Sequence, residues 1–90
     1  MHVEAAETLA LEALAFLASD ERRLGALLAQ AGWTLDELRA GASDPIVLAG
    51  VLDFLLSDER LVVAFCEAAN CVPEAPLRAR RALPGSAFDG

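Results

Sequence analysis

A four-residue phrase that occurs twice limits the possible folds of this chain more than any other feature. Ser-Asp-Glu-Arg stands at residues 19–22 and again at residues 57–60, which is 38 residues further on. The likeness extends upstream, where three apolar residues recur at the same offset: Leu14, Phe16 and Leu17 against Leu52, Phe54 and Leu55. The sequence therefore predicts two similar halves, each with a long helix, a sharp corner, a second helix and a short third helix.

The composition favours helices over strands. The chain of 90 residues contains 19 Ala and 16 Leu, but only six Val, one Ile and two Thr. Ala and Leu lose little side-chain freedom in a helix, whereas β-branched residues are typical of sheets. We expect an all-α protein: a compact bundle of five to six helices built from two approximate 38-residue repeats. Residues 1–85 should form a single helical domain and residues 86–90 a flexible C-terminal tail.

Start and stop signals divide the chain further. The serine of each repeated phrase is a candidate N-cap, and the acidic residues after it suit the positive end of a helix dipole. Thr34 and Glu37 form a capping box, and Asp44-Pro45 is typical of a helix start. Gly32 and Asn70 suit the left-handed position that follows a helix. The predicted helices cover residues 4–18, 20–31, a short segment after Thr34, 45–56, 58–69 and 73–83.

Apolar spacing predicts which faces are buried. In the first helix the stripe contains Leu9, Ala13, Phe16 and Leu17, widened by Leu11 and Leu14. In the second helix it contains Leu24, Leu27, Leu28 and Ala31. The helix over 45–56 is apolar on nearly all sides, so it should be the central and most buried one.

The charge balance excludes some classes of partner. The formal net charge is −7, and all seven basic residues are Arg. Nucleic acids and anionic membranes attract basic surfaces, so we expect neither as a partner. The apolar runs are shorter than the ~20 residues that span a bilayer, and the acidic N-terminal segment lacks the basic start of a signal peptide. A cytoplasmic protein is expected.

No residue pattern indicates catalysis, a cofactor or a metal site. Cys66 and Cys71 are the two thiols, and at the 38-residue offset they correspond to Leu28 and Trp33. We therefore interpret them as space-filling residues rather than a redox pair or half of a zinc site. The single histidine, His2, lies near the N-terminus, and neither Ser19 nor Ser57 has a neighbouring base to activate it. We expect a protein that is not an enzyme.

Arginine concentrates near the end of the last helix, at Arg78, Arg80 and Arg81. Cations are favoured at a helix C-terminus, and such a group can also form an interface rim with Trp33 as an anchor. The leading hypothesis is a non-catalytic protein–protein interaction or adaptor module that binds a protein partner or a second copy of itself. The alternative is a binder of a small apolar ligand, with its cavity between the halves near Phe16, Phe54 and Phe65.

Several phrases in order resemble a known family. They are Ala13–Ala18, Leu24 to Gly32, Asp36–Arg39, Leu52–Glu59 and Ala79–Gly85. With these phrases the chain resembles a bacterial family of short acidic helical proteins catalogued as a domain of unknown function. The resemblance implies the helical fold and the cytosolic compartment, and it brings no catalytic residues.

Overall fold

The computed structural model describes residues 1–85, and that part of the chain contains α-helices and no strand. The six helices are Val3–Ala18 (α1), Glu21–Ala31 (α2), Leu35–Ala40 (α3), Pro45–Leu56 (α4), Glu59–Ala69 (α5) and Ala75–Ala82 (α6). The radius of gyration is 11.9 Å, close to the ~12 Å of a compact domain of this length. The all-α prediction is thus confirmed; the tail predicted for residues 86–90 lies outside the described residues.

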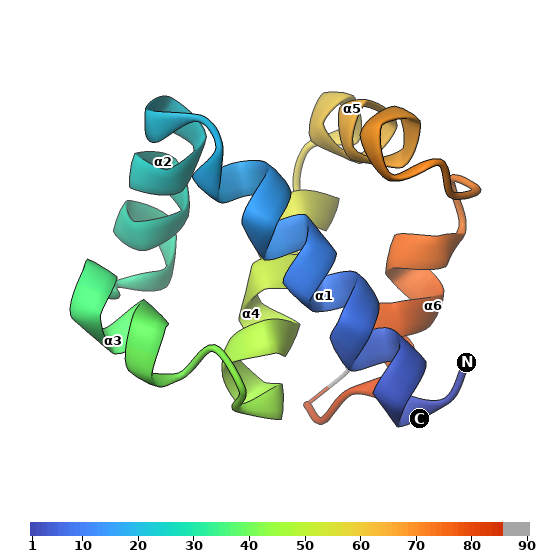
Figure 1. Cartoon of the computed structure of the whole chain (residues 1–90), viewed down its shortest axis with the longest axis horizontal. Helices are drawn as coiled ribbons and strands as arrows, with labels where there is room; N and C mark the ends of the chain where they lie inside the picture. The colour runs from blue at the N-terminus through green and yellow to red at the C-terminus, as the bar shows by residue number, and fades with distance from the viewer. Residues whose placement is uncertain (86–90) are drawn as a thin grey trace.

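Helix α1 holds the arrangement together. It runs diagonally across α4 and also packs against α2, α5 and α6 (Figure 1). In that view α2 and α3 lie on one side of α1, and α5 and α6 lie on the other. The first helix of each half, α1 or α4, therefore lies at the centre of the bundle.

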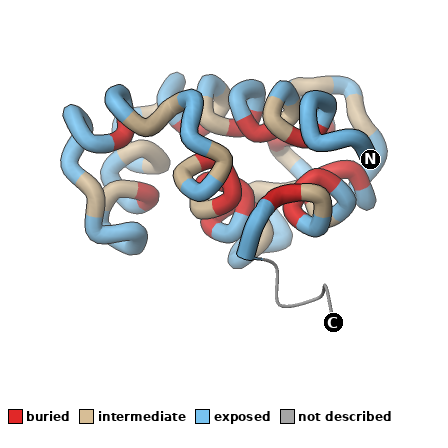
Figure 2. Tube along the Cα trace, turned by 90° about the horizontal axis from the view of Figure 1, so that it is seen from below, coloured by how far each residue is buried: buried red, intermediate tan, exposed pale blue. Residues whose placement is uncertain are grey.

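The central position predicted for α4 is confirmed. Six of its twelve residues are buried: Leu48, Ala49, Val51, Leu52, Phe54 and Leu55. Buried residues along the trace face the inside of the molecule, as the red segments of Figure 2 show. Because α4 contacts α1, α2, α5 and α6, an apolar surface on most of its sides is what this position requires.

The buried face of α1 differs from the predicted stripe. Its fully buried residues are Ala6, Ala10, Ala13 and Leu17. Leu9 and Phe16 are partly buried, and Leu11 is 45% exposed. The alanine row lets neighbouring helices approach α1 closely, so small residues occupy the innermost line and larger ones flank it.

The corners of the two halves correct one prediction. Asp20 and Asp58, not the serines, are the N-caps of α2 and α5. Asp20 accepts hydrogen bonds from the N–H groups of residues 22 and 23, and Asp58 accepts one from that of residue 60. Ser19 and Ser57 end the preceding helices instead, each donating its hydroxyl to the carbonyl three residues earlier at 2.6 Å. Each of these carbonyls also accepts the backbone N–H of the same serine, so the serine reinforces the end of one helix and leaves the next residue to cap the following helix.

The other boundaries follow the sequence signals with one shift. The capping box of Thr34 and Glu37 has both its bonds, and Asp44 caps α4. Gly32 and Asn70 adopt the left-handed conformation, with φ of 74° and 55°. Helix α6 starts at Ala75 rather than at residue 73, because a separate turn closes first through the hydrogen bond from Ala75 N–H to the Val72 carbonyl.

Helix α2 is less buried than its apolar stripe predicts. Leu27 is its one fully buried residue, whereas Leu24 and Leu28 are partly buried and Ala31 is exposed. This follows from its place at the edge of the bundle, where neighbours cover only one side (Figure 1). None of the helices in residues 1–85 combines the length and the apolar character needed to cross a bilayer.

Candidate functional site

The three C-terminal arginines do not form one surface. Arg78 and Arg81 lie on the exposed side of α6, three residues apart and hence on one face. Arg80 points inward and is 7% exposed. The prediction that all three contribute to an interface is therefore corrected for Arg80, whose guanidinium is enclosed by the fold itself.

The interactions of Arg80 explain its burial. Its Nε donates to Asp53 Oδ1 at 2.6 Å, and its Nη1 donates to the carbonyls of Leu83 and Pro84. A buried cation is tolerated when its charge is paired and its N–H groups have acceptors, and both conditions are met here. Arg80 thus links α6 to α4 and binds two carbonyls that follow the C-terminal end of α6.

Trp33 is half-buried against α4. The position that a side-chain carbon would take on Gly50 lies 2.7 Å from Cη2 of Trp33, so the indole occupies the space that the glycine leaves. Trp33 also lines a hollow of about 290 Å³ together with Asp53 and Phe54. These contacts show that Trp33 packs between the C-terminal end of α2 and α4. The exposed arginines Arg78 and Arg81 lie on a different helix, α6.

The phenylalanines named in the ligand hypothesis separate into two places. Phe16 and Phe65 meet edge to face, with ring centroids 5.7 Å apart and planes at 65°. Phe54 is buried and lines the hollow beside Trp33 instead. The guanidinium of Arg23 lies 4.7 Å from the centroid of the Phe16 ring. Contacts with both an aromatic ring and a cation hold the Phe16 side chain in one orientation.

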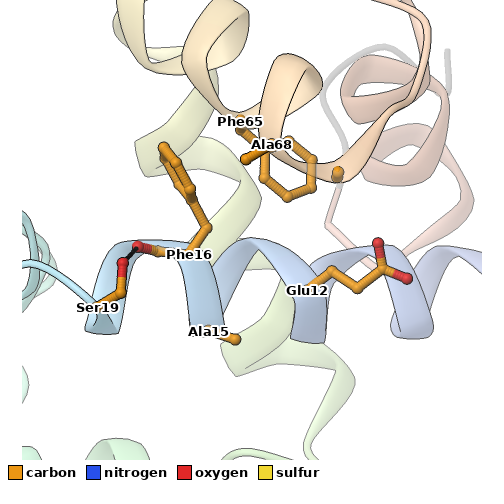
Figure 3. Close-up of a pocket in the computed structure, with 7 residues that line it drawn as sticks. Glu12, Ala15, Phe16, Ser19, Phe65 and Ala68 are labelled. Atoms are coloured by element: carbon orange, nitrogen blue, oxygen red, sulfur yellow. Dashed lines mark hydrogen bonds between the residues drawn. The ribbon is translucent and has the colours of Figure 1, made fainter.

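Phe16 and Phe65 lie in a surface groove between α1 and α5, which we name the α1–α5 groove. It has a volume of about 430 Å³, and the residues that line it are Glu12, Ala15, Phe16, Ser19, Phe65, Ala68 and Ala69. Figure 3 shows the two rings and Ala68 facing one another between the helices, with Glu12 further along α1. Because three of the lining residues are alanines, the helices leave space that larger side chains would fill.

The α1–α5 groove is lined mainly by apolar side chains. Glu12 is the one charged residue among the described residues that line it. The hydroxyl of Ser19 donates to the Phe16 carbonyl at 2.6 Å, the dashed line in Figure 3. A carboxylate beside an apolar floor suits an apolar surface that carries a cation.

The cysteines lie at the C-terminal end of α5, and both are free. Cys66 is buried, as predicted, and Cys71 is partly buried against the core. Burial raises the pKa of the Cys66 thiol to about 11, and a hydrogen bond with Cys71, its charge and that of Glu74 add to the effect. Cys66 is therefore a protonated thiol at neutral pH. In residues 1–85 no group of three or more His, Cys, Asp or Glu side chains could hold a metal ion.

Sequence reasoning missed the ion pair of Asp53 with Arg80 and most of the α1–α5 groove. One signal was present for the ion pair, because Asp53 is the single charged residue in the apolar helix α4. Such a residue needs either solvent or a partner, and here it has one 27 residues away. The groove had no comparable signal, since its position depends on how far apart α1 and α5 lie.

Comparison with known proteins places the chain in a family. No curated protein and no solved structure among those compared matches it. One family model does match, over residues 3–86, and its description is "Protein of unknown function (DUF3572)". Since the match covers nearly the whole sequence, the chain belongs to the DUF3572 family of proteins of unknown function.

Proposed function

We propose that the chain is a non-catalytic protein-interaction module whose α1–α5 groove receives an amphipathic helix of a partner protein. The observation that carries this proposal is the pair Phe16 and Phe65, whose rings meet in a groove of about 430 Å³ that no side chain of residues 1–85 fills. An apolar groove between two helices suits the apolar face of a third helix. Aromatic side chains in such a groove supply much of the binding energy.

The charge of the molecule suggests which helix fits. A net charge of −7 favours a basic partner over an acidic one for the molecule as a whole. Glu12 lines the groove, so a Lys or Arg beside the apolar face of the partner helix would meet a carboxylate. The Phe16 ring is already held by Phe65 and Arg23, and a preformed site reduces the ordering cost of binding.

Two further features belong to the same proposal. The exposed Arg78 and Arg81 on α6 offer a basic face to an acidic partner, including a second copy of this acidic chain. We also interpret the halves as copies of one 38-residue unit, because α2 and α5 both have eleven residues, an aspartate N-cap and a left-handed residue at the end. A cytoplasmic location remains the expectation.

A peptide titration followed by NMR tests the groove. The probe is a synthetic amphipathic helix of Leu, Ala and Lys, added to the ¹⁵N-labelled full chain. We expect the amide shifts to concentrate at Ala15, Ser19, Ala68 and Ala69. Ala68→Arg puts bulk and positive charge into the groove, and it should weaken binding at least about tenfold, the result of losing about 1.4 kcal/mol.

Ala29→Arg is the matched control, because Ala29 is an exposed alanine on α2 that does not line the groove. It adds the same charge and should leave the affinity within about twofold of the unmodified chain. Equal weakening by both substitutions would mean that only net charge matters, and the groove would be the wrong site. Shifts confined to other helices would have the same meaning.

Two additional measurements test the small apolar ligand and the homodimer as alternatives. Dodecanoate replaces the peptide as a probe of the ligand hypothesis; saturable binding that Ala68→Arg abolishes, without any peptide binding, would favour a small apolar ligand in the same groove. Light scattering from micromolar to millimolar concentrations tests self-association. A monomer mass at every concentration would remove the homodimer.

A further inference from the structure

The C-terminal turn of α5 brings the two thiols of the chain together. The Cys71 N–H donates to the Cys66 carbonyl at 3.0 Å, across the left-handed residue Asn70. This bond places Cys71 directly after the last turn of α5, against the residue that begins that turn. The raised pKa of the Cys66 thiol, to which Cys71 contributes, agrees with this placement.

The helix-ending motif accounts for this contact. In a Schellman motif the N–H of the residue after the left-handed position donates to the carbonyl of a residue in the last turn of the helix. The side chains of the donor residue and of the acceptor residue frequently make an apolar contact. The end of α2 shows the same pattern, where the Trp33 N–H bonds to the Leu28 carbonyl at 3.0 Å. In α5 both contact positions carry sulfur instead of hydrocarbon.

We infer that Cys66 and Cys71 form a thiol–disulfide exchange site, which reacts with the disulfide of a low-molecular-weight thiol and closes an intramolecular Cys66–Cys71 disulfide. A disulfide requires two cysteines whose Cα atoms are close and whose side chains face each other. The backbone hydrogen bond between the two residues brings them together at the Schellman turn, where the side chains of these two positions commonly meet, so that closure needs no rearrangement of the helices.

The different burial of the two cysteines determines which thiol attacks first. Cys71 is partly exposed and can meet a small disulfide in solution, whereas Cys66 is 6% exposed. Cys66 donates its S–H to the Val72 carbonyl at 3.5 Å, and its raised pKa, about 11, keeps it protonated at neutral pH. Cys71 therefore attacks first and Cys66 second. Closure by Cys66 is the slow step, because only the thiolate attacks.

The reaction has two steps when oxidised glutathione is the small disulfide. The Cys71 thiolate attacks one sulfur of the glutathione disulfide, the S–S bond of that molecule breaks, and one glutathione leaves as a thiolate that takes up a proton. Cys66 then loses its proton to water and attacks Cys71 Sγ, which expels the second glutathione. Two electrons pass from the protein thiols to the glutathione disulfide.

Closing the disulfide changes the turn in one defined way. The Val72 carbonyl accepts the Cys66 S–H in the reduced protein, and oxidation removes that donor. The segment between α5 and α6 then gains a covalent link at its second residue, Cys71.

Redox titration of the full chain in glutathione buffers tests the inference. After alkylation, intact mass should show a species that lacks two alkyl groups, and peptide mapping should find residues 66 and 71 linked. Cys66→Ala should stop at a glutathione adduct on Cys71. If the unmodified chain keeps two alkylatable thiols even in excess oxidised glutathione, or forms only adducts and disulfide-linked dimers, the inference is wrong.

A matched control keeps the number of thiols and changes their placement. Ala68 is an exposed residue two positions after Cys66, and residues two apart on a helix do not face each other. The double variant Cys71→Ser with Ala68→Cys should therefore form the adduct without the intramolecular disulfide. An equally efficient disulfide in this variant would show that helix fraying, not the Schellman contact, brings the thiols together. Circular dichroism of every variant confirms that the helices are retained.

Discussion

The two halves of the chain agree in their second helix and differ in their third. Helices α2 and α5 have the same length, the same type of N-cap and the same left-handed end. The third helices do not correspond: Leu38 is the one buried residue of α3, whereas α6 buries Ala75, Pro76, Ala79 and Arg80. Local capping signals thus reproduce a corner wherever they occur, but the burial of the next helix depends on partners from the other half.

Among pairs of sites, replacing an arginine in α6 and one in α3 should give the largest difference in unfolding free energy. Arg80→Ala removes the partner of Asp53 and the donor to two carbonyls. It should lower the free energy of unfolding by about 2–3 kcal/mol, less than for a fully buried pair because the Asp53 side chain is 58% exposed. Arg39→Ala, at an exposed position in the last turn of α3, should change it by less than about 0.5 kcal/mol. Urea unfolding measures both, and equal losses would refute the idea that α6 is anchored more firmly.

The glycines of α2 and α4 should respond to alanine with opposite signs. A Cβ on Gly25 meets no atom within 4 Å, whereas one on Gly50 would lie 2.7 Å from Trp33. Gly25→Ala should raise the unfolding free energy by about 0.5–1 kcal/mol through helix propensity. Gly50→Ala should lower it by about 1 kcal/mol, because overpacking outweighs that gain.

Trp33→Phe provides the control for this pair of glycines, since a smaller ring leaves room at residue 50. Combined with Gly50→Ala, it should recover part of the loss that the alanine causes alone. Thermal unfolding of the two single variants and the double variant gives the coupling. A purely additive result would show that the contact between Trp33 and residue 50 does not determine the effect.

The corners should show the smallest effects, and they test the similarity of the halves. Asp20→Ala and Asp58→Ala should each cost about 1 kcal/mol, with Asp20 the larger because it accepts two hydrogen bonds and Asp58 one. Ser19→Ala and Ser57→Ala should each cost less than about 0.5 kcal/mol, since their hydroxyls bond near the surface. Losses larger at the serines than at the aspartates would restore the serines as caps.

The signals that predicted the fold were local ones. Gly32, Asn70 and the Thr34–Glu37 box act within a few residues, so the sequence alone indicates where these helices begin and end. Ser19 was misplaced by one position because Ser and Asp are both good N-caps and adjacent, and only the backbone shows which of them bonds forward. Period and composition likewise identified α4 as the central helix.

The features that escaped prediction depend on distances between helices. Arg80 sits in a basic cluster that resembles a solvated helix end, and its burial follows from Asp53 on another helix. The α1–α5 groove is lined by the small residues Ala15, Ala68 and Ala69, and its width depends on the spacing of the two helices. The proximity of Cys71 to Cys66 is an exception, because it arises within the turn at Asn70, which the sequence indicates.

The alanine row of α1 has a consequence for how this chain can vary. Ala6, Ala10 and Ala13 have no exposed surface, and α1 packs against both α4 and α6. A bulkier residue at any of these positions would force α1 away from its neighbours, and no surface change could compensate. We therefore expect these three sites to tolerate little beyond Ala, Gly and Ser, whereas the outer faces of the helices should accept larger changes.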